Sequence, residues 1–245
     1  MISRARLKFL RSLARKKERR EHGQLLLEGP RVVEEAVRAG VVETLFLADA
    51  VEMETTLPVE RLDGPDVDAL QETRNSAGVF ALARDPVRPF DASLVEGDAP
   101  LVLADGMADP GNLGTVIRTA AALGFGAVVC AEGSVEATNP KVVRATAGAL
   151  FQIPVLRGSR DELTAAGYAL WAADAGGEPV RDADTRPARV ALLLGNEPRG
   201  IDPAARSEAA RVVSVPMAAG VESLNVAAAA AILMDRIRTL QVAHP

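Results

Sequence analysis

Cysteine and histidine are scarce in this sequence of 245 residues, which contains only Cys130, His22 and His244. A single cysteine excludes an intrachain disulfide framework and a cysteine-rich metal cluster. The two histidines lie at opposite ends of the sequence, so it predicts no histidine-rich catalytic centre and no zinc site. Any chemistry is therefore expected from amide, carboxylate, hydroxyl and guanidinium groups.

Aromatic residues and long apolar runs are also scarce. Aromatic residues make up 3% of the chain, although 48% of it is hydrophobic, which is enough to form a core. The longest apolar run, residues 226–234, is nine residues long, well short of the roughly 18 that a membrane span needs. The amino end is basic but lacks the apolar core and cleavage site of a secretory signal. We therefore expect a soluble, cytoplasmic protein.

Positive charge is concentrated at the amino end of an acidic chain. The whole sequence has 28 basic and 33 acidic residues, yet its first 40 residues hold 11 basic against five acidic ones. The densest stretch contains Arg15, Lys16, Arg19 and Arg20. Such a segment is typical of a local contact with a polyanion such as RNA, although a solvated helix face explains the pattern equally well.

The first part of the chain, residues 1–84, is predicted to be a small α/β domain. Apolar spacing indicates a helix over residues 2–20 and another beginning at Pro30. Strands are expected at residues 24–27, 41–48 and 78–83, with a short helix at 66–73. Residues 85–100 contain three prolines and several acids, which is typical of a linker.

Residues 101–245 alternate between strands and helices. This order predicts a mostly parallel sheet covered on both faces. The expected strands are 101–104, 127–130, 169–173, 190–194 and 212–215, and the expected helices are 112–123, 139–150 and 223–240. The last helix is apolar nearly all round between residues 226 and 234, so a second surface should cover it, either from the same chain or from another subunit.

Three polar loops follow predicted strands, where ligand sites of open α/β sheets lie. The first holds Asn112 and leads to Arg118, the second holds Gly195-Asn196-Glu197, and the third runs from Val215 to Asn225. Each loop has a simpler interpretation, because Asn112 and Ser223 are natural helix caps and a turn explains glycine and asparagine. The first loop is not the Gly-x-Gly-x-x-Gly fingerprint of dinucleotide-binding proteins.

In this order the three loops resemble the three motifs of the SpoU/TrmH family, which are RNA 2′-O-ribose methyltransferases of the SPOUT class. The residues that carry the resemblance are Asn112-Leu113-Gly114 with Arg118-Thr119-Ala120, then Leu194-Gly195-Asn196-Glu197 with Gly200, then Val215-Pro216-Met217 with Glu222-Ser223-Leu224-Asn225-Val226. Residues 26–31 resemble the family's substrate-binding domain. The resemblance implies an α/β fold in which residues 101–245 form a mostly parallel sheet with a deep trefoil knot, preceded by the amino-terminal domain.

The resemblance also implies a cofactor, S-adenosyl-L-methionine, and a homodimer packed through the carboxyl-terminal domain. It implies a set of residues that bind the cofactor: Gly195, Asn196, Val215, Met217 and Leu224. It implies a second set at the reaction centre: Asn112, Arg118, Glu197, Ser223 and Asn225. The sequence departs from many relatives at Pro198, which fixes the local φ and removes an amide donor, and Arg199 beside it is a further candidate for contact with RNA.

The expected reaction is attack of a ribose 2′-oxygen on the methyl group of S-adenosylmethionine. The family assigns the residue at Arg118 to the 2′-hydroxyl, but a guanidinium is a poor base at neutral pH. We therefore expect Arg118 to bind the hydroxyl and an adjacent phosphate, while Glu197 orients Arg118 or the neighbouring loops. Ribosomal RNA is the preferred substrate and transfer RNA the alternative.

Two other classes of function remain at this stage. A non-catalytic RNA-binding protein on the same scaffold would not need Asn112, Arg118, Glu197 and Asn225 together. An oxidoreductase with a nucleotide cofactor would be expected to carry the glycine fingerprint that the first loop lacks.

Overall fold

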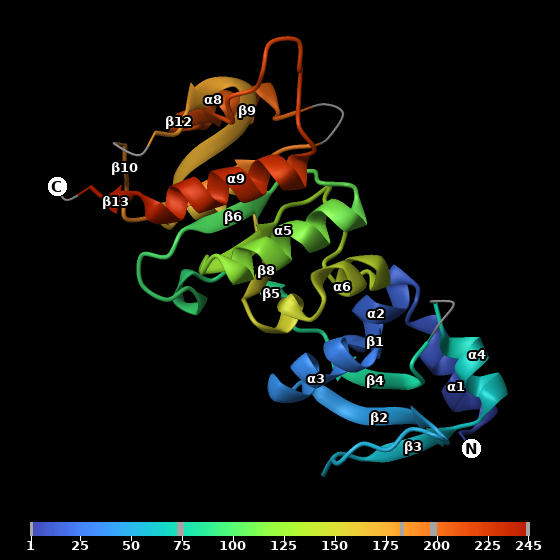
Figure 1. Cartoon of the computed structure of the whole chain (residues 1–245). Coiled ribbons are helices and arrows are strands. Elements are labelled where there is room, and N and C mark those ends of the chain that lie inside the picture. Colours follow the sequence, from blue (N-terminus) through green and yellow to red (C-terminus); the bar gives the residue numbers. More distant parts are fainter. Residues whose placement is uncertain (1, 73–75, 182–183, 197–199, 244–245) are drawn as a thin grey trace. The chain divides into compact units, whose positions relative to one another are not determined.

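The computed structural model describes residues 2–72, 76–181, 184–196 and 200–243, which form two compact units (Figure 1). The first unit comprises the chain up to Pro86 together with Thr138–Gln152, and the second comprises Val87–Ala137 and the chain from Ile153 on. The stretch 85–100, expected to be a linker, contains strand β5 (Arg88–Pro89) and a 3₁₀ helix (Ala92–Leu94). Val87 and Val95 are buried, so most of this stretch is part of the second unit.

The first unit contains a four-stranded sheet in the order β1-β4-β2-β3. The strands are β1 (Gln24–Glu28), β2 (Val42–Ala48), β3 (Val59–Leu62) and β4 (Val79–Arg84); β3, which the sequence analysis missed, runs parallel to β2, and the other pairs are antiparallel. Helix α3 (Pro30–Arg38) begins at Pro30, as predicted, and α4 (Gly64–Leu70) lies within the range expected for a short helix except for its first two residues.

The expected single helix over residues 2–20 is wrong, because the chain forms α1 (Arg4–Ser12) and α2 (Lys16–His22) with a turn between them. Leu10 and Leu13 are buried in a cluster with Phe46 and Phe80. Arg19 stabilises the break, since its Nη1 donates to the carbonyls of Leu13 (3.1 Å) and Ala14 (2.8 Å). These carbonyls at the end of α1 would otherwise lack helical partners.

The second unit is built on a seven-stranded sheet in which every pair of neighbours is parallel, in the order β12-β9-β11-β6-β7-β8-β5. Besides β5, its strands are β6 (Leu101–Ala104), β7 (Ala127–Cys130), β8 (Val155–Arg157), β9 (Ala169–Pro179), β11 (Val190–Leu194) and β12 (Arg211–Ser214). The central strands β6 and β11 are fully buried apolar runs, as expected of a sheet covered on both faces. The structure therefore confirms an α/β fold with a large parallel sheet.

Helices α5 (Pro110–Ala122) and α9 (Val226–Thr239) pack side by side against this sheet, in green and red in Figure 1. The unit also contains α7 (Arg160–Ala165), α8 (Pro203–Glu208) and a small parallel pair of strands, β10 (Thr185–Arg186) and β13 (Gln241–Val242). No helix in the described ranges combines the length and apolar character needed to cross a membrane.

Between β7 and β8 the chain contributes a segment to the first unit. Helix α6 (Pro140–Thr146) begins at the cap Asn139, as predicted, but ends four residues before the expected Leu150. The chain turns there because Ala147 adopts a left-handed conformation with φ of 50°. Gly148 follows, where a Cβ atom would come within 2.6 Å of Cγ of Glu35 in the first unit, so the packing requires glycine.

Candidate active site

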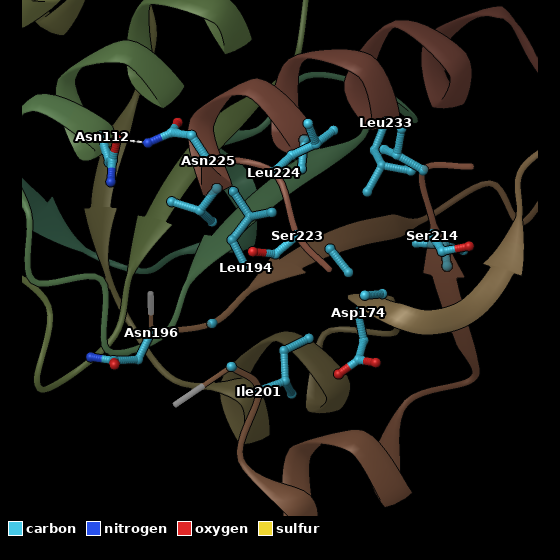
Figure 2. Close-up of a pocket in the computed structure, with 18 of the residues that line it drawn as sticks. Asn112, Asp174, Leu194, Asn196, Ile201, Ser214, Ser223, Leu224, Asn225 and Leu233 are labelled. Atoms are coloured by element: carbon cyan, nitrogen blue, oxygen red, sulfur yellow. Dashed lines mark hydrogen bonds between the residues drawn. The ribbon is translucent and has the colours of Figure 1, made fainter. Parts of the chain in front are cut away.

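A cavity of about 880 Å³ opens at the carboxyl ends of β6, β11 and β12 in the second unit. It is lined by residues of all three polar loops, and Figure 2 shows several of them around the same space. The predicted site residues that line it are Asn112, Gly195, Asn196, Val215, Met217, Ser223, Leu224 and Asn225. The structure thus brings together eight of the ten residues that the sequence analysis placed in catalysis or cofactor binding.

The first and third loops meet through two asparagines. Nδ2 of Asn225 donates a hydrogen bond to Oδ1 of Asn112 at 3.0 Å, the dashed line in Figure 2. The two residues are 113 positions apart in the sequence, and each lies at the start of its helix. This hydrogen bond therefore joins the amino-terminal ends of α5 and α9 at the rim of the cavity.

Asn112 is not the helix cap that its position in the sequence allowed. Asp109 caps α5, with Oδ1 accepting from the amide of Asn112 at 2.8 Å, and Pro110 is the first helical residue. Asn112 lies in the first turn, so its side chain can face α9.

The interpretation of Ser223 as the cap of the last helix is wrong. The cap of α9 is Asn225, whose Oδ1 accepts from the amides of Ala227 (2.9 Å) and Ala228 (3.2 Å). Because asparagine and serine are comparably good caps, propensity does not decide between them. Ser223 is exposed and lines the cavity.

The second loop is held by backbone hydrogen bonds across a narrow bridge. Asn196 and Gly200 pair in antiparallel fashion, with N–O distances of 3.0 and 2.8 Å. A Cβ atom on Gly195 would lie 2.5 Å from the carbonyl oxygen of Gly200, so this strand end requires glycine. Nδ2 of Asn196 donates to the carbonyl of Gly106 at 2.8 Å, which ties the second loop to the first.

Two predicted residues of the reaction centre are not among those that line the cavity. Arg118 is exposed on α5, and its side chain makes no hydrogen bond or ion pair with any part of the chain that the structure describes. It follows Asn112 by about one and two-thirds helical turns, so the two side chains leave the helix in different directions. Glu197, together with Pro198 and Arg199, lies outside the described residues.

The sequence analysis missed Asp174, which lines the cavity from β9 (Figure 2). Its carboxylate pairs with Arg206 at 2.6 Å and accepts from the amide of Gly176 at 2.8 Å. Burial raises the pKa of the Asp174 carboxyl, but the hydrogen bonds from Arg206 and Gly176 outweigh burial and leave the pKa lowered. The cavity therefore has an ionised carboxylate on one wall, which the sequence did not indicate because the strand was expected to end at residue 173.

A second carboxyl group lies behind the first loop. Asp105 follows β6 directly and faces the guanidinium of Arg160, with Nε to Oδ2 at 3.5 Å, while Arg160 also pairs with Glu208 at 3.5 Å. Burial raises the pKa of the Asp105 carboxyl, and the charge of Arg160 opposes that rise only in part. This contact anchors the residue that precedes Gly106, the acceptor for Asn196.

The lining combines apolar surface with a few fixed polar groups, as small-molecule sites commonly do. Leu194, Leu224 and Leu233 supply apolar walls, while the amides of Asn112, Asn196 and Asn225 supply donors and acceptors. The glycine at position 195 allows a ligand or a neighbouring chain segment to approach the backbone. This donor set suits an amphipathic nucleoside ligand of the size of S-adenosylmethionine.

Comparison of the sequence with known protein families supports this assignment of the site. The model of the SpoU rRNA methylase family matches residues 99–235, more than half of the chain. The chain belongs to the SpoU rRNA methylase family. Residues 4–81 match an MRM3-like substrate binding domain, so both parts of the resemblance are confirmed.

Relatives of this SpoU family member cover nearly its whole length. The 23S rRNA (guanosine(2553)-2′-O)-methyltransferase of Bacillus subtilis is 34% identical over 95% of this chain and 96% of its own. The 23S rRNA (uridine(2479)-2′-O)-methyltransferase of Streptomyces viridochromogenes is 34% identical over 92% of this chain and 86% of its own. A solved structure of the SpoU methyltransferase AviRb from Streptomyces viridochromogenes, in complex with the cofactor AdoMet, superposes with a TM-score of 0.83, at 28% identity over 95% of this chain and 96% of that one.

The basic residues predicted to contact RNA lie in the first unit and differ in exposure. Arg15, Lys16 and Arg20 are exposed, and Arg15 forms an ion pair with Glu18 at 3.2 Å. Arg19 is only 3% exposed, with its guanidinium turned inward to the carbonyls of Leu13 and Ala14. The assignment of Arg19 to RNA is therefore wrong, because helical periodicity alone does not distinguish a buried basic residue from its exposed neighbours.

Proposed function

We propose that this SpoU family member transfers a methyl group from S-adenosylmethionine to a ribose 2′-hydroxyl of ribosomal RNA. The observation that carries the proposal is the convergence of the three loops on one cavity, closed by the hydrogen bond between Asn112 and Asn225. The names of the relatives from Bacillus subtilis and Streptomyces viridochromogenes support ribosomal RNA over transfer RNA as the substrate. We also propose that it acts in the cytoplasm, because the relatives that match nearly the whole chain are bacterial.

The cavity suits the cofactor because its walls are partly apolar and because Gly195 lets a ligand approach the backbone. We assign contact with the cofactor to Gly195, Asn196, Val215, Met217 and Leu224, all of which line the cavity. The carboxylate of Asp174 adds fixed hydrogen-bond acceptors to one wall, while its charge is balanced by Arg206. When bound, S-adenosylmethionine supplies a methyl group already activated by a positively charged sulfur.

The chain's own contribution is then to position the ribose. Asn112, Ser223 and Asn225 lie at the rim and can orient a hydroxyl group, and holding two reactants in line is worth roughly 7–11 kcal/mol in well-oriented systems. Arg118 does not line this cavity within one copy of the chain, but we still assign it to the 2′-hydroxyl and an adjacent phosphate of the bound RNA. Its exposed planar guanidinium matches a phosphate and stays charged. Glu197 orients Arg118 or the second loop, and Arg199 provides a further phosphate contact.

We also propose a homodimer formed through the second unit. The buried face of α9 comprises Ala227, Ala230, Leu233, Met234 and Ile237, yet its opposite face is also apolar at its start. Ala228 and Ile232 are exposed there, and Ile232 is 42% exposed. A second copy of the chain would cover this face.

The proposed function is tested with purified protein, S-adenosylmethionine labelled on its methyl group, and 23S rRNA transcribed in vitro. We expect label in the RNA at a nucleotide whose 3′ bond resists alkaline cleavage, since a methylated 2′-oxygen cannot attack that bond. Arg118→Ala should lower the rate by roughly 100-fold or more, the loss typical of removing a charge-stabilising group, while calorimetry still detects cofactor binding. Arg118→Lys should recover only part of the rate, because it keeps the charge but not the planar fork.

Arg181→Ala serves as the control, because Arg181 is an exposed arginine of the same unit that does not line the cavity. Full methyl transfer by Arg118→Ala would contradict the role of Arg118. Binding of RNA by the wild-type protein without any methyl transfer would identify a non-catalytic RNA-binding protein instead.

A further inference from the structure

A second, smaller cavity lies wholly within the first unit. It has a volume of about 220 Å³ and is enclosed by α1, β1, α4 and α6 with their adjoining turns. It shares no residue with the cavity of the second unit. Helix α6 belongs to the segment that the chain contributes to the first unit between β7 and β8, so the cavity exists only when that segment is in place.

The walls of this cavity combine aliphatic side chains with polar groups that are held in fixed positions. Leu26 supplies aliphatic surface, and the small exposed parts of Leu70 and Val143 add to it, while Leu10 is fully buried. Among the polar lining groups, a carboxylate oxygen of Glu28 accepts from the amide of Glu72 at 3.0 Å, and Glu72 forms an ion pair with Arg144. Nε2 of Gln71 donates to Asp68 at 2.9 Å. Apolar faces bounded by fixed donors and acceptors match a flat heterocycle with polar edges.

The size of the cavity limits what it can hold. Sites for drug-sized ligands occupy about 300–1,000 Å³, so a cavity of 220 Å³ is too small for a whole nucleoside cofactor. A single nucleobase is a ligand of suitable size.

The positive charge near the cavity indicates that such a base would belong to a polyanion. Residues 4–22 contain nine basic residues against two glutamates, within an acidic chain. Arg11 lines the cavity and is exposed, and Lys8 and Arg15 are exposed nearby in the sequence. This surface favours a polyanion, and RNA is recognised chiefly through bases splayed out of single strands while its phosphates meet basic side chains.

We propose that the cavity of the first unit binds one unpaired base of the RNA substrate. This inference rests on the proposed function, because it names where that substrate is read. The base enters between the aliphatic walls, its edge meets Glu28 and Gln71, and its flanking phosphates lie along the basic face of α1.

The test fills the cavity from two sides. Ala69→Phe in α4 and Ala14→Phe in the turn after α1 each replace a small lining residue with a ring. Ala39→Phe is the matched control, because Ala39 is exposed in the same unit and does not line the cavity. The full-length proteins are titrated with 23S rRNA transcribed in vitro at several salt concentrations, and cofactor binding is measured by calorimetry.

We expect both filled variants to bind the RNA about tenfold more weakly at every salt concentration, a loss of the size typical of one base-specific contact. The slope of affinity against salt should stay unchanged, because that slope counts phosphate contacts. Cofactor binding should match the wild type in all variants, which shows that the second unit is intact. Circular dichroism spectra and thermal unfolding that match the wild type show that the first unit, which holds the filled cavity, is also folded. Ala14→Phe decides the matter if Ala69→Phe does not fold.

Wild-type affinity in the filled variants would overturn the proposal, as would a changed salt slope, which would place the cavity on the phosphate path. Failure of the proposed methyltransferase function can be told apart from failure of this proposal, since the wild-type protein would then bind RNA without transferring a methyl group. In that case the effect of filling the cavity on RNA binding still decides whether it holds a base.

Discussion

Asn225 uses both polar atoms of its side-chain amide. Oδ1 accepts from two backbone amides at the start of α9, and Nδ2 donates to Asn112 at the start of α5. Serine and threonine also combine a cap acceptor with a donor, but both lie on one shorter hydroxyl, whereas asparagine separates them on two atoms. A stability role and a site role therefore coincide in one residue, and substitutions that retain one atom can separate them.

Asn225→Ala should destabilise the protein by about 1 kcal/mol, the usual loss for removing a helix cap, and should also abolish methyl transfer. Asn225→Asp keeps the cap acceptor but lacks the donor, so its stability should stay close to that of the wild type while its activity falls. Urea unfolding and a methyl-transfer assay measure the two effects. Asn139→Ala, which removes a cap of α6 in the first unit, is the control for cap loss outside the cavity. In Asn225→Asp the amide of Asn112 could turn over and donate to the new carboxylate, so Asn112→Asp/Asn225→Asp, in which neither side chain can donate, is measured beside it. Full activity in both would show that the hydrogen bond between the two positions does not matter for the reaction.

Residue types were easier to predict than residue contacts. The amides at 112, 196 and 225 could be singled out because loops after parallel strands converge at one edge of the sheet. The roles of Ser223 and Arg19 could not, because capping depends on where the helix begins and burial depends on how the turn after α1 folds back. Asp174 was missed for a related reason, since β9 continues six residues past its apolar part and carries that carboxylate to the cavity.

Helix α2 presents most of its charge to solvent, and it does so because one basic residue turns inward. Arg19 faces the turn and holds it, while Lys16, Lys17 and Arg20 remain exposed. The element thus has a structural side and a side available to a polyanion. The RNA contact proposed for the amino end belongs to the exposed side alone.

Reversing the exposed charges with Lys16→Glu and Arg20→Glu should weaken binding of 23S rRNA and flatten its dependence on salt by up to about two ions, one for each phosphate that is no longer neutralised. Lys141→Glu, which alters an exposed lysine on α6, is the control for a change of net charge. Filter binding at four salt concentrations gives both quantities. If the slope of RNA affinity against salt concentration is unchanged, these side chains do not contact RNA phosphates and α2 has no role in RNA binding.

At the level of elements, strong periodicity and caps located the central strands and α5 within two residues of their observed bounds. Apolar spacing missed the break between α1 and α2, because Leu7, Leu10 and Leu13 keep a helical spacing up to the turn. It also missed β3, whose sequence Val-Glu-Arg-Leu has only two apolar residues and is stabilised by pairing with β2. Tertiary contacts decide such short elements.

On the scale of the whole molecule, the division into units follows packing more closely than chain order. The first unit draws α6 from the middle of the sequence, and no composition change marks that insertion. The parallel sheet could be predicted because β6, β7 and β11 are short, mostly buried apolar runs, each followed by a helix before the next strand. The deep trefoil knot that the family resemblance implies stays a prediction, since strand order and register do not define how the chain is threaded.

The uncovered apolar face of α9 gives the largest-scale prediction. Ala228 and Ile232 lie one helical turn apart on that face, and a dimer would bury both. Ile232→Glu would place a carboxylate in the contact, and burying an unpaired charge costs several kcal/mol, so the dissociation constant should rise by at least 100-fold. Sedimentation velocity over a range of concentrations measures the change, and calorimetry with S-adenosylmethionine shows whether the cavity is intact, because Ile232 does not line it.

The control is Thr239→Glu, which should leave the dimer unchanged, because Thr239 is exposed near the end of the same helix but outside its apolar part. The proposed interface would be wrong if the wild-type protein sediments as a monomer at all concentrations. It would also be wrong if Ile232→Glu leaves the dissociation constant of the dimer unchanged.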